Sequence, residues 1–203
     1  MKQKGQTLYF ITSLLLLSGI FIMIFFFFNN KHTNQLTSVK NSLIIANNTL
    51  ITNILDANKN LGYKINNLTL IDSLNKKCKL EDIMSSKTIL VYRVSYTNCS
   101  SCVVSGLQSL SKSTSSILYN NIIIIGSYYN NSDLKKFIKT NQIKFNIYNL
   151  KQDLNLPAEE FDIPYFIVLS KDLTVLSCFF PEKTTPIYTK YFFSGIEHFF
   201  INK

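Results

Sequence analysis

The chain has 203 residues, which is room for one ordinary domain and an appendage. Its apolar content of 46% is normal for a globular protein with a buried core, and four cysteines are too few for a disulfide scaffold. The formal net charge is +9, from 21 basic and 12 acidic residues. Because the lysines are spread along the chain and cluster only in pairs, we expect a solvated basic surface and no nucleic-acid partner.

The first predicted element is a membrane anchor. Residues 8–28, LYFITSLLLLSGIFIMIFFFF, carry no charge and would form a helix about 31 Å long, enough to cross a bilayer core. The flank MKQKGQ is basic, so the N-terminus should stay in the cytoplasm. A cleaved signal peptide is the alternative, but FFFFNNKH offers no small-residue cleavage pattern. Residues 1–30 are therefore predicted to be a cytoplasmic tip and a transmembrane anchor that contacts membrane lipid.

A helical stalk is predicted at residues 31–60. Apolar residues recur there at spacings of three and four, at Leu36, Val39, Leu43, Ala46 and Leu50. This pattern fits an amphipathic helix, or a short coiled coil that would dimerise the chain. Residues 61–203 remain for a folded domain. In a bacterium, this architecture predicts a single-pass protein of the inner membrane with its C-terminal domain in the periplasm.

The domain alternates strands and helices. Strands are predicted at residues 67–72, 78–80, 88–96, 121–129, 144–150, 164–170 and 173–179. A helical turn is predicted at 81–86, and helices are predicted after Cys102, at 132–142 with Ser132 as N-cap, and at 187–202. The four consecutive isoleucines of NIIIIGSYY suit a central strand that is covered on both faces. The order predicts an α/β fold.

The stretch SYTNCSSCVV places Cys99 and Cys102 three positions apart where a strand passes into a helix. Haem attachment is excluded because Val103 stands where C-x-x-C-H needs histidine. Zinc would need two more ligands, whereas Cys78 and Cys178 are isolated and the two histidines lie at opposite ends of the chain. We therefore predict no metal site. Cys78 and Cys178 could pair with each other, remain inert buried thiols, or include one that acts in a relay.

These features together resemble the thioredoxin fold, and more narrowly the membrane-anchored TlpA- and ResA-type proteins with the related thiol-specific-antioxidant family. The resemblance covers residues 61–202. It rests on strand 88–96 running into C-S-S-C, on the hairpin INNLTLIDSLNKKCKLEDI before the core, on an extra β-α unit, and on D-I-P-Y-F-I-V-L. It implies a three-layer α/β/α thioredoxin-like fold with an N-terminal β-hairpin and an inserted β-α unit, preceded by one transmembrane helix.

The resemblance also implies roles for the site residues. Cys99 would attack, Cys102 would resolve, and Pro164 would match the cis-proline that faces the cysteines and shapes the substrate edge with Ile163. A helix N-terminus lowers a cysteine pKa, which suits Cys99. No small-molecule cofactor is implied. Partners would be protein thiols and disulfides of the cell envelope, with a membrane thiol-electron donor.

The chain departs from that pattern near the cysteines. Asn98 and Ser101 stand where relatives carry tryptophan and proline, and Arg93 stands where thioredoxins keep a buried acid. Ser100 and Ser101 could donate hydrogen bonds to the thiolate. Arg93 could stabilise the thiolate, or could instead pair with an acid such as Asp72 or Glu81.

The predicted function is thiol-disulfide exchange with protein substrates outside the cytoplasm, as an enzyme. The direction, reductive or oxidative, stays open. One alternative is a redox-inactive thioredoxin-like envelope protein that binds or assembles others. A thiol peroxidase is a further alternative. Its motif is P-x-x-x-T-x-x-C, but in this chain Thr97 is one position away from the threonine of that motif and no proline precedes it.

Overall fold

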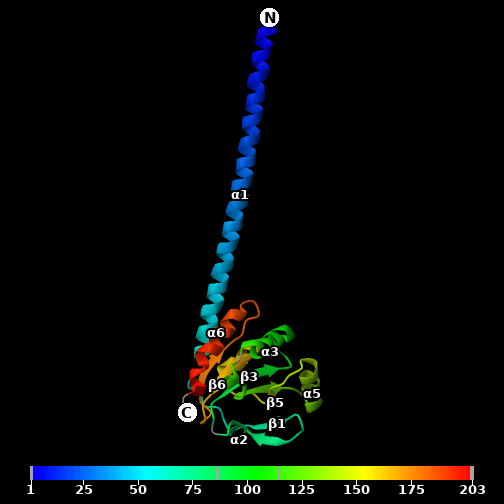
Figure 1. Cartoon of the computed structure of the whole chain (residues 1–203), viewed down its shortest axis with the longest axis vertical. Coiled ribbons are helices and arrows are strands. Elements are labelled where there is room, and N and C mark those ends of the chain that lie inside the picture. The colour runs from blue at the N-terminus through cyan, green and yellow to red at the C-terminus, as the bar shows by residue number, and fades with distance from the viewer. Residues whose placement is uncertain (1, 86, 114, 202–203) are drawn as a thin grey trace. The chain divides into compact units, whose positions relative to one another are not determined.

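The computed structural model describes residues 2–85, 87–113 and 115–201, and the side chains of these from residue 17 onward except at 113, 116 and 117. The chain forms two compact units, residues 1–51 and 52–203. The first unit is the part of helix α1 up to residue 51; the helix itself runs unbroken through Lys2–Asn58 and covers the predicted anchor and residues 31–58 of the predicted stalk (Figure 1). Part of the predicted span, residues 8–16, lies outside the residues with described side chains. Over the described residues, no helix combines the length and the apolar composition needed to cross a membrane.

The second unit contains a seven-stranded mixed sheet in the order β2-β1-β5-β4-β3-β6-β7. The strands are β1 (Thr69–Asp72), β2 (Lys77–Lys79), β3 (Ile89–Ser95), β4 (Ile122–Ser127), β5 (Asn146–Asn149), β6 (Tyr165–Leu169) and β7 (Val175–Phe179). β3 is central; it pairs parallel with β4 and antiparallel with β6. The predicted N-terminal hairpin is confirmed, since β1 and β2 pair antiparallel. The predicted inserted unit is also present, as a helix followed by β5, which pairs parallel with β4.

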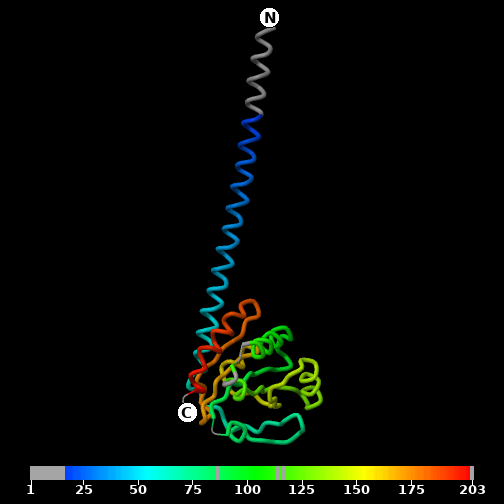
Figure 2. Tube along the Cα trace, viewed as in Figure 1, coloured from blue at the N-terminus to red at the C-terminus, as the bar shows by residue number. Residues whose placement is uncertain are grey.

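In the described part of the chain, seven shorter helices surround the sheet. They are α2 (Leu80–Met84), α3 (Ser100–Ser113), α4 (Ser116–Tyr119), α5 (Asn131–Thr140), the 3-10 helix η1 (Pro157–Phe161), α6 (Pro186–Ile196) and α7 (His198–Ile201). Figure 2 traces the chain from the hairpin through these elements. Helices α3, α5 and α6 pack on one face through residues such as Leu107, Leu134 and Phe193. The opposite face is covered by shorter elements, through Met84 of α2 and Ala158 of η1.

The core explains why β3 and β4 are central. Along β4, Ile122 and Ile124 face the core under α3, and Ile123 and Ile125 face the core under η1. A run of isoleucines is therefore buried from both sides, as a strand covered on both faces requires. The second unit begins before the predicted boundary at residue 61, because Ala57 at the end of α1 packs into the domain core.

Several local predictions were wrong in detail. Helix α5 is capped by Asn130 rather than Ser132, since the Asn130 side chain accepts a hydrogen bond from the Asp133 amide at 2.9 Å. The terminal helix ends at Ile196, and a separate short helix follows it. Leu173, predicted as a strand residue, has φ of 65° and belongs to the turn between β6 and β7. Its amide donates to the Ser170 carbonyl at 2.9 Å, which closes that turn.

Candidate functional site: a Cys-x-x-Cys pair at a helix start

The cysteine pair lies where β3 passes into α3. Asn98 closes the connecting turn, because its side-chain oxygen accepts a hydrogen bond from the Ser95 amide at 2.7 Å. Cys99 immediately precedes α3, and its carbonyl accepts the first helical hydrogen bonds from the amides of Cys102 and Val103, at 2.9 and 3.0 Å. Its side chain therefore stands among amide groups that have no partner within the helix. Cys99 is exposed, whereas Cys102, one turn on, is half-buried.

The two thiols have opposite pKa shifts. The pKa of Cys99 is lowered from 9.0 to about 7, chiefly by a hydrogen bond from the Cys102 thiol, then by the Ser101 hydroxyl and the Cys102 amide. The pKa of Cys102 is raised, chiefly by that same hydrogen bond to Cys99 and then by burial. All four cysteines are free thiols, so this is the reduced form of the pair. Cys99 is thus the thiol that ionises near neutral pH, and disulfide exchange requires a thiolate.

The two serines between the cysteines differ. The Ser101 hydroxyl lies 3.1 Å from the Cys99 sulfur, which is within hydrogen-bonding distance. Ser100 is exposed, and its hydroxyl makes no hydrogen bond with any described residue. Lys183, in the loop before α6, donates to the Ser101 hydroxyl at 3.3 Å and lowers the pKa of Cys102. Sequence reasoning missed Lys183, because it is 82 positions from Ser101 in a loop without a motif.

The segment predicted to shape a substrate edge, Ile163 and Pro164, precedes β6, but its proline is not cis. The Ile163–Pro164 bond is trans, as is every peptide bond in the described part of the chain. The chain instead turns at Asp162, which adopts the left-handed conformation with φ of 47°. The Asp162 carboxylate accepts hydrogen bonds from the Thr97 hydroxyl at 2.5 Å and from the Asn98 side-chain Nδ2 at 3.1 Å. This contact holds the segment before β6 against the loop that carries Cys99.

Pro164 and Ile163 therefore lie near the pair. β3 and β6 are antiparallel with Arg93 opposite Tyr165, so Pro164 is at the end of the sheet where β3 leads into Cys99. Pro164 is buried, and Ile163 is 40% exposed. The structure brings the predicted edge to the predicted cysteines, although sequence reasoning did not assign the linking role to Asp162.

Arg93 is buried on β3, with 3% of its side chain exposed. Its Nε donates to Glu159 at 2.9 Å, and its Nη2 donates to the Ser127 hydroxyl at 2.9 Å and to the other Glu159 oxygen at 3.3 Å. The pairing with an acid was predicted, but the acid is Glu159 of η1. Arg93 is not among the groups that shift the pKa of Cys99.

The two acids suggested as partners of Arg93, Asp72 and Glu81, accept hydrogen bonds from other groups. The Asp72 carboxylate accepts hydrogen bonds from the amides of Leu74 and Lys76, both at 2.8 Å, and closes the β1–β2 turn. Glu81 accepts from the Asn67 side chain at 2.7 Å. Sequence position alone does not show that η1 crosses the sheet face on which Arg93 projects.

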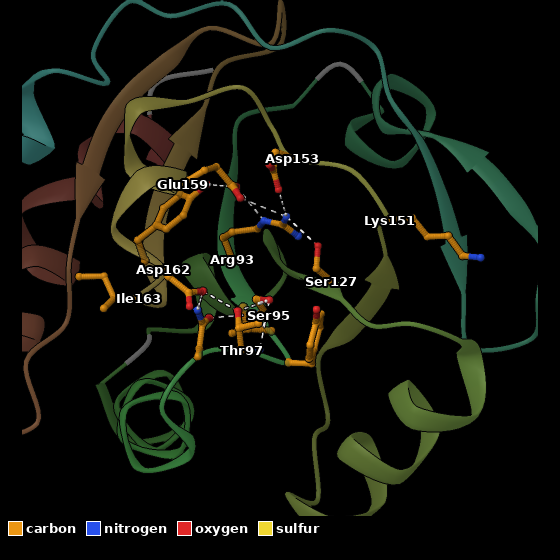
Figure 3. A pocket seen from close by; sticks show the side chains of 13 residues that line it. Arg93, Ser95, Thr97, Ser127, Lys151, Asp153, Glu159, Asp162 and Ile163 are labelled. Carbon is orange, nitrogen blue, oxygen red and sulfur yellow. Dashed lines mark hydrogen bonds and ion pairs between the residues drawn. The ribbon is translucent and has the colours of Figure 1, made fainter.

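A pocket of about 280 Å³ lies next to the cysteine loop (Figure 3). Arg93 and Glu159 line one part of it, and the linked pair Thr97 and Asp162 lines another. Asn98, which precedes Cys99, and Ile163, which precedes Pro164, complete the side nearest the cysteines.

Cys78 and Cys178 cannot pair, because β2 and β7 are the two edge strands of the sheet. Cys178 is buried, and burial raises its pKa to about 12. The pKa of Cys78 is also raised, first by burial and then by Asp72. Both are therefore poor nucleophiles at neutral pH.

Comparisons with known proteins agree on the fold. No family profile and no curated protein sequence matches this chain. Among solved structures, the thioredoxin domain of a thiol-disulfide oxidoreductase from Bacteroides vulgatus is similar with a TM-score of 0.50 and 20% identity, covering 69% of this chain and 97% of that one. A protein described as the thiol:disulfide interchange protein DsbE from Chlorobium tepidum has a TM-score of 0.53 and 13% identity, with coverage of 69% and 97%. The domain is thus thioredoxin-like in fold.

Proposed function

We propose that this chain is a thiol-disulfide oxidoreductase that exchanges disulfides with protein substrates through Cys99 and Cys102. The observation that carries the proposal is the pKa split within the pair: the exposed thiol at the helix start ionises near neutral pH, and the half-buried thiol behind it does not. The similarity to structures named as oxidoreductases and interchange proteins supports the same function.

The chemistry follows from the geometry. The Cys99 thiolate attacks one sulfur of a client disulfide, forms a mixed disulfide and releases the other client sulfur as a thiolate. Cys102 then loses its proton and attacks the Cys99 sulfur, which forms the Cys99–Cys102 disulfide and releases the second client sulfur. The client gains two electrons, and the pair loses them. Read in reverse, the same steps oxidise a client dithiol.

A redox titration of residues 29–203 tests this function. The fragment would be equilibrated in glutathione buffers, and alkylated thiols at Cys99 and Cys102 would be counted by mass spectrometry. A reversible two-electron transition supports an exchanger, near about −270 mV for a thioredoxin-like reductant or near about −120 mV for an oxidant. A pair that stays locked or stays free at every potential overturns the enzyme and leaves the redox-inactive binding protein.

The role assignment has its own test. Cys102→Ala should accumulate mixed disulfides through Cys99, because the resolving thiol is missing. Cys99→Ala should not accumulate them. An identical set of trapped partners from both variants would contradict the assignment.

We further propose that the protein is a TlpA- or ResA-type member of the cell envelope, anchored in the inner membrane with residues 61–203 outside the cytoplasm. The support is the uncharged stretch 8–28 and the basic flank MKQKGQ before it. A membrane thiol-electron donor would then return the pair to its working state. A membrane-impermeant maleimide should label Cys99 in intact spheroplasts; labelling only after lysis would overturn this orientation.

A further inference from the structure

The pocket beside the cysteine loop contains a buried donor that has no hydrogen-bond partner within the part of the chain that the structure describes. The Nη1 atom of Arg93 is buried and has no hydrogen-bond partner among the described residues, whereas Nε and Nη2 of the same guanidinium are occupied. A buried guanidinium normally has all of its N–H groups paired. Because Arg93 lines the pocket, a group that enters it and displaces the atoms covering Nη1 would meet these open N–H groups.

The carboxylates of the pocket are only partly in use. Glu159 accepts from Arg93 and from the Tyr165 hydroxyl at 2.5 Å. One oxygen of Asp162 accepts from Thr97 and Asn98. The open position at Arg93 therefore calls for an acceptor oxygen.

Charge argues against an anion as the source of that oxygen. The pocket is lined by two cationic side chains, Arg93 and Lys151, and by three carboxylates, Asp153, Glu159 and Asp162, so its formal charge is negative. Arg93 is already neutralised by Glu159 at 2.9 Å. Figure 3 shows the Lys151 side chain pointing away from the guanidinium. A neutral group that accepts one hydrogen bond and donates others fits both the open N–H groups and the surplus of acceptor oxygens.

A carboxamide has this combination, since it carries one acceptor oxygen and an NH₂ group with two donors. We propose that the Arg93 pocket is a specificity subsite that receives an asparagine or glutamine side chain of the client, close to the client cysteine that exchanges with Cys99. The proximity follows from the lining, because Asn98 adjoins Cys99 and Ile163 adjoins Pro164. This inference rests on the proposed exchange function and names its preferred substrate class.

The test compares three short peptides that differ at one position. Each has a single cysteine in a mixed disulfide with 2-mercaptoethanol, and carries glutamine, glutamate or methionine beside that cysteine, with the position varied on either side. These side chains are similar in size, so the comparison isolates hydrogen bonding and charge. With the reduced full chain, the glutamine peptide should have a kcat/KM on the order of tenfold higher than the methionine peptide, carried by KM.

The outcomes separate the two proposals. Exchange with no peptide overturns the proposed function, and equal exchange with all three overturns the subsite while the function stands. A preference for glutamate also overturns the carboxamide assignment, since it would show an anion site. A serine-for-cysteine version of the glutamine peptide should compete, and the methionine version should compete less.

Two variants locate the preference on the protein. Arg93→Met combined with Glu159→Gln removes both charges of the buried pair together, so that neither is left alone. In this variant the ratio of kcat/KM for the glutamine peptide to that for the methionine peptide should fall to about one. Lys151→Met at the exposed rim should keep the preference; its loss there would show that lysine charge, not the Arg93 donor, selects the client. Lys135→Met on α5 serves as the matched remote control.

Discussion

Ser101→Ala should raise the pKa of Cys99. The Ser101 hydroxyl lies 3.1 Å from the Cys99 sulfur, and the Lys183 ammonium donates to the same hydroxyl oxygen at 3.3 Å. Because the lysine occupies an acceptor position on that oxygen, the hydroxyl hydrogen is free to point at the sulfur. Alanine removes this donor, whereas the Cys102 thiol and the Cys102 amide remain as donors to the thiolate.

The magnitude follows from the remaining donors. With a pKa of about 7, half of the Cys99 thiol is ionised at pH 7. The Cys102 thiol has the larger influence and is retained, so the variant should recover only part of the difference from 9.0. A rise of about half a pKa unit lowers the thiolate fraction at pH 6 about threefold. Above about pH 9 both proteins are ionised, and their rates should converge.

The assay is the rate of iodoacetamide alkylation at Cys99, followed by mass spectrometry from pH 5 to pH 10 on the fully reduced protein. Ser100→Ala is the matched control, since Ser100 makes no hydrogen bond with any described residue and its loss should leave the profile unchanged. An unchanged profile for Ser101→Ala would refute the reasoning. A uniform change at every pH would also refute it, because that result indicates altered access rather than altered ionisation.

Three other predictions concern the framework of the site. Gly106→Ala should lower the free energy of unfolding in urea by about 1–3 kcal/mol, because the added Cβ would lie 2.1 Å from the Tyr92 hydroxyl. This loss should outweigh the higher helix propensity of alanine. An unchanged urea midpoint would contradict this packing. Asp162→Ala should speed amide hydrogen exchange in the loop around Thr97, which loses its 2.5 Å hydrogen bond, and unaltered exchange would show that Asp162 does not hold the loop. The pKa of Cys178 is raised to about 12, so in the folded protein at pH 8 its alkylation should be at least about a thousandfold slower than that of Cys99. Unfolding in urea should remove this difference. Comparable rates for the two cysteines in the folded protein would disprove the burial of Cys178.

The sheet and the position of the pair could be predicted because both depend on local sequence. Runs such as TILVYRVSY are rich in β-formers, and residues 89–95 within it form β3. A Cys-x-x-Cys that follows such a strand falls at a helix start, and Cys99 does so. The sequence left two roles open for Arg93, and the cost of an unpaired buried charge favoured the one that the structure has, pairing with an acid.

The partners within the site could not be predicted in the same way, since they depend on where distant segments meet. Glu159 is 66 positions from Arg93, Asp162 is 65 from Thr97, and Lys183 is 82 from Ser101. Short elements such as η1 carry no periodic pattern, so their placement on the sheet is not visible in sequence. The acid in D-I-P-Y was the one available signal, because a polar residue beside the strand-opening proline lies at the same sheet end as the cysteines.

The contact between the two thiols also orders the steps of exchange. The largest influences on Cys102 are its hydrogen bond to Cys99 and burial, followed by the negative charge of Cys99, and all three raise its pKa. When Cys99 enters a mixed disulfide, its charge disappears, and with it the hydrogen bond and the charge that held Cys102 protonated. Lys183 remains as an influence that lowers the pKa of Cys102. Cys102 is therefore a poor nucleophile before the client is bound covalently and a better one afterward, which is the order that resolution of a mixed disulfide requires.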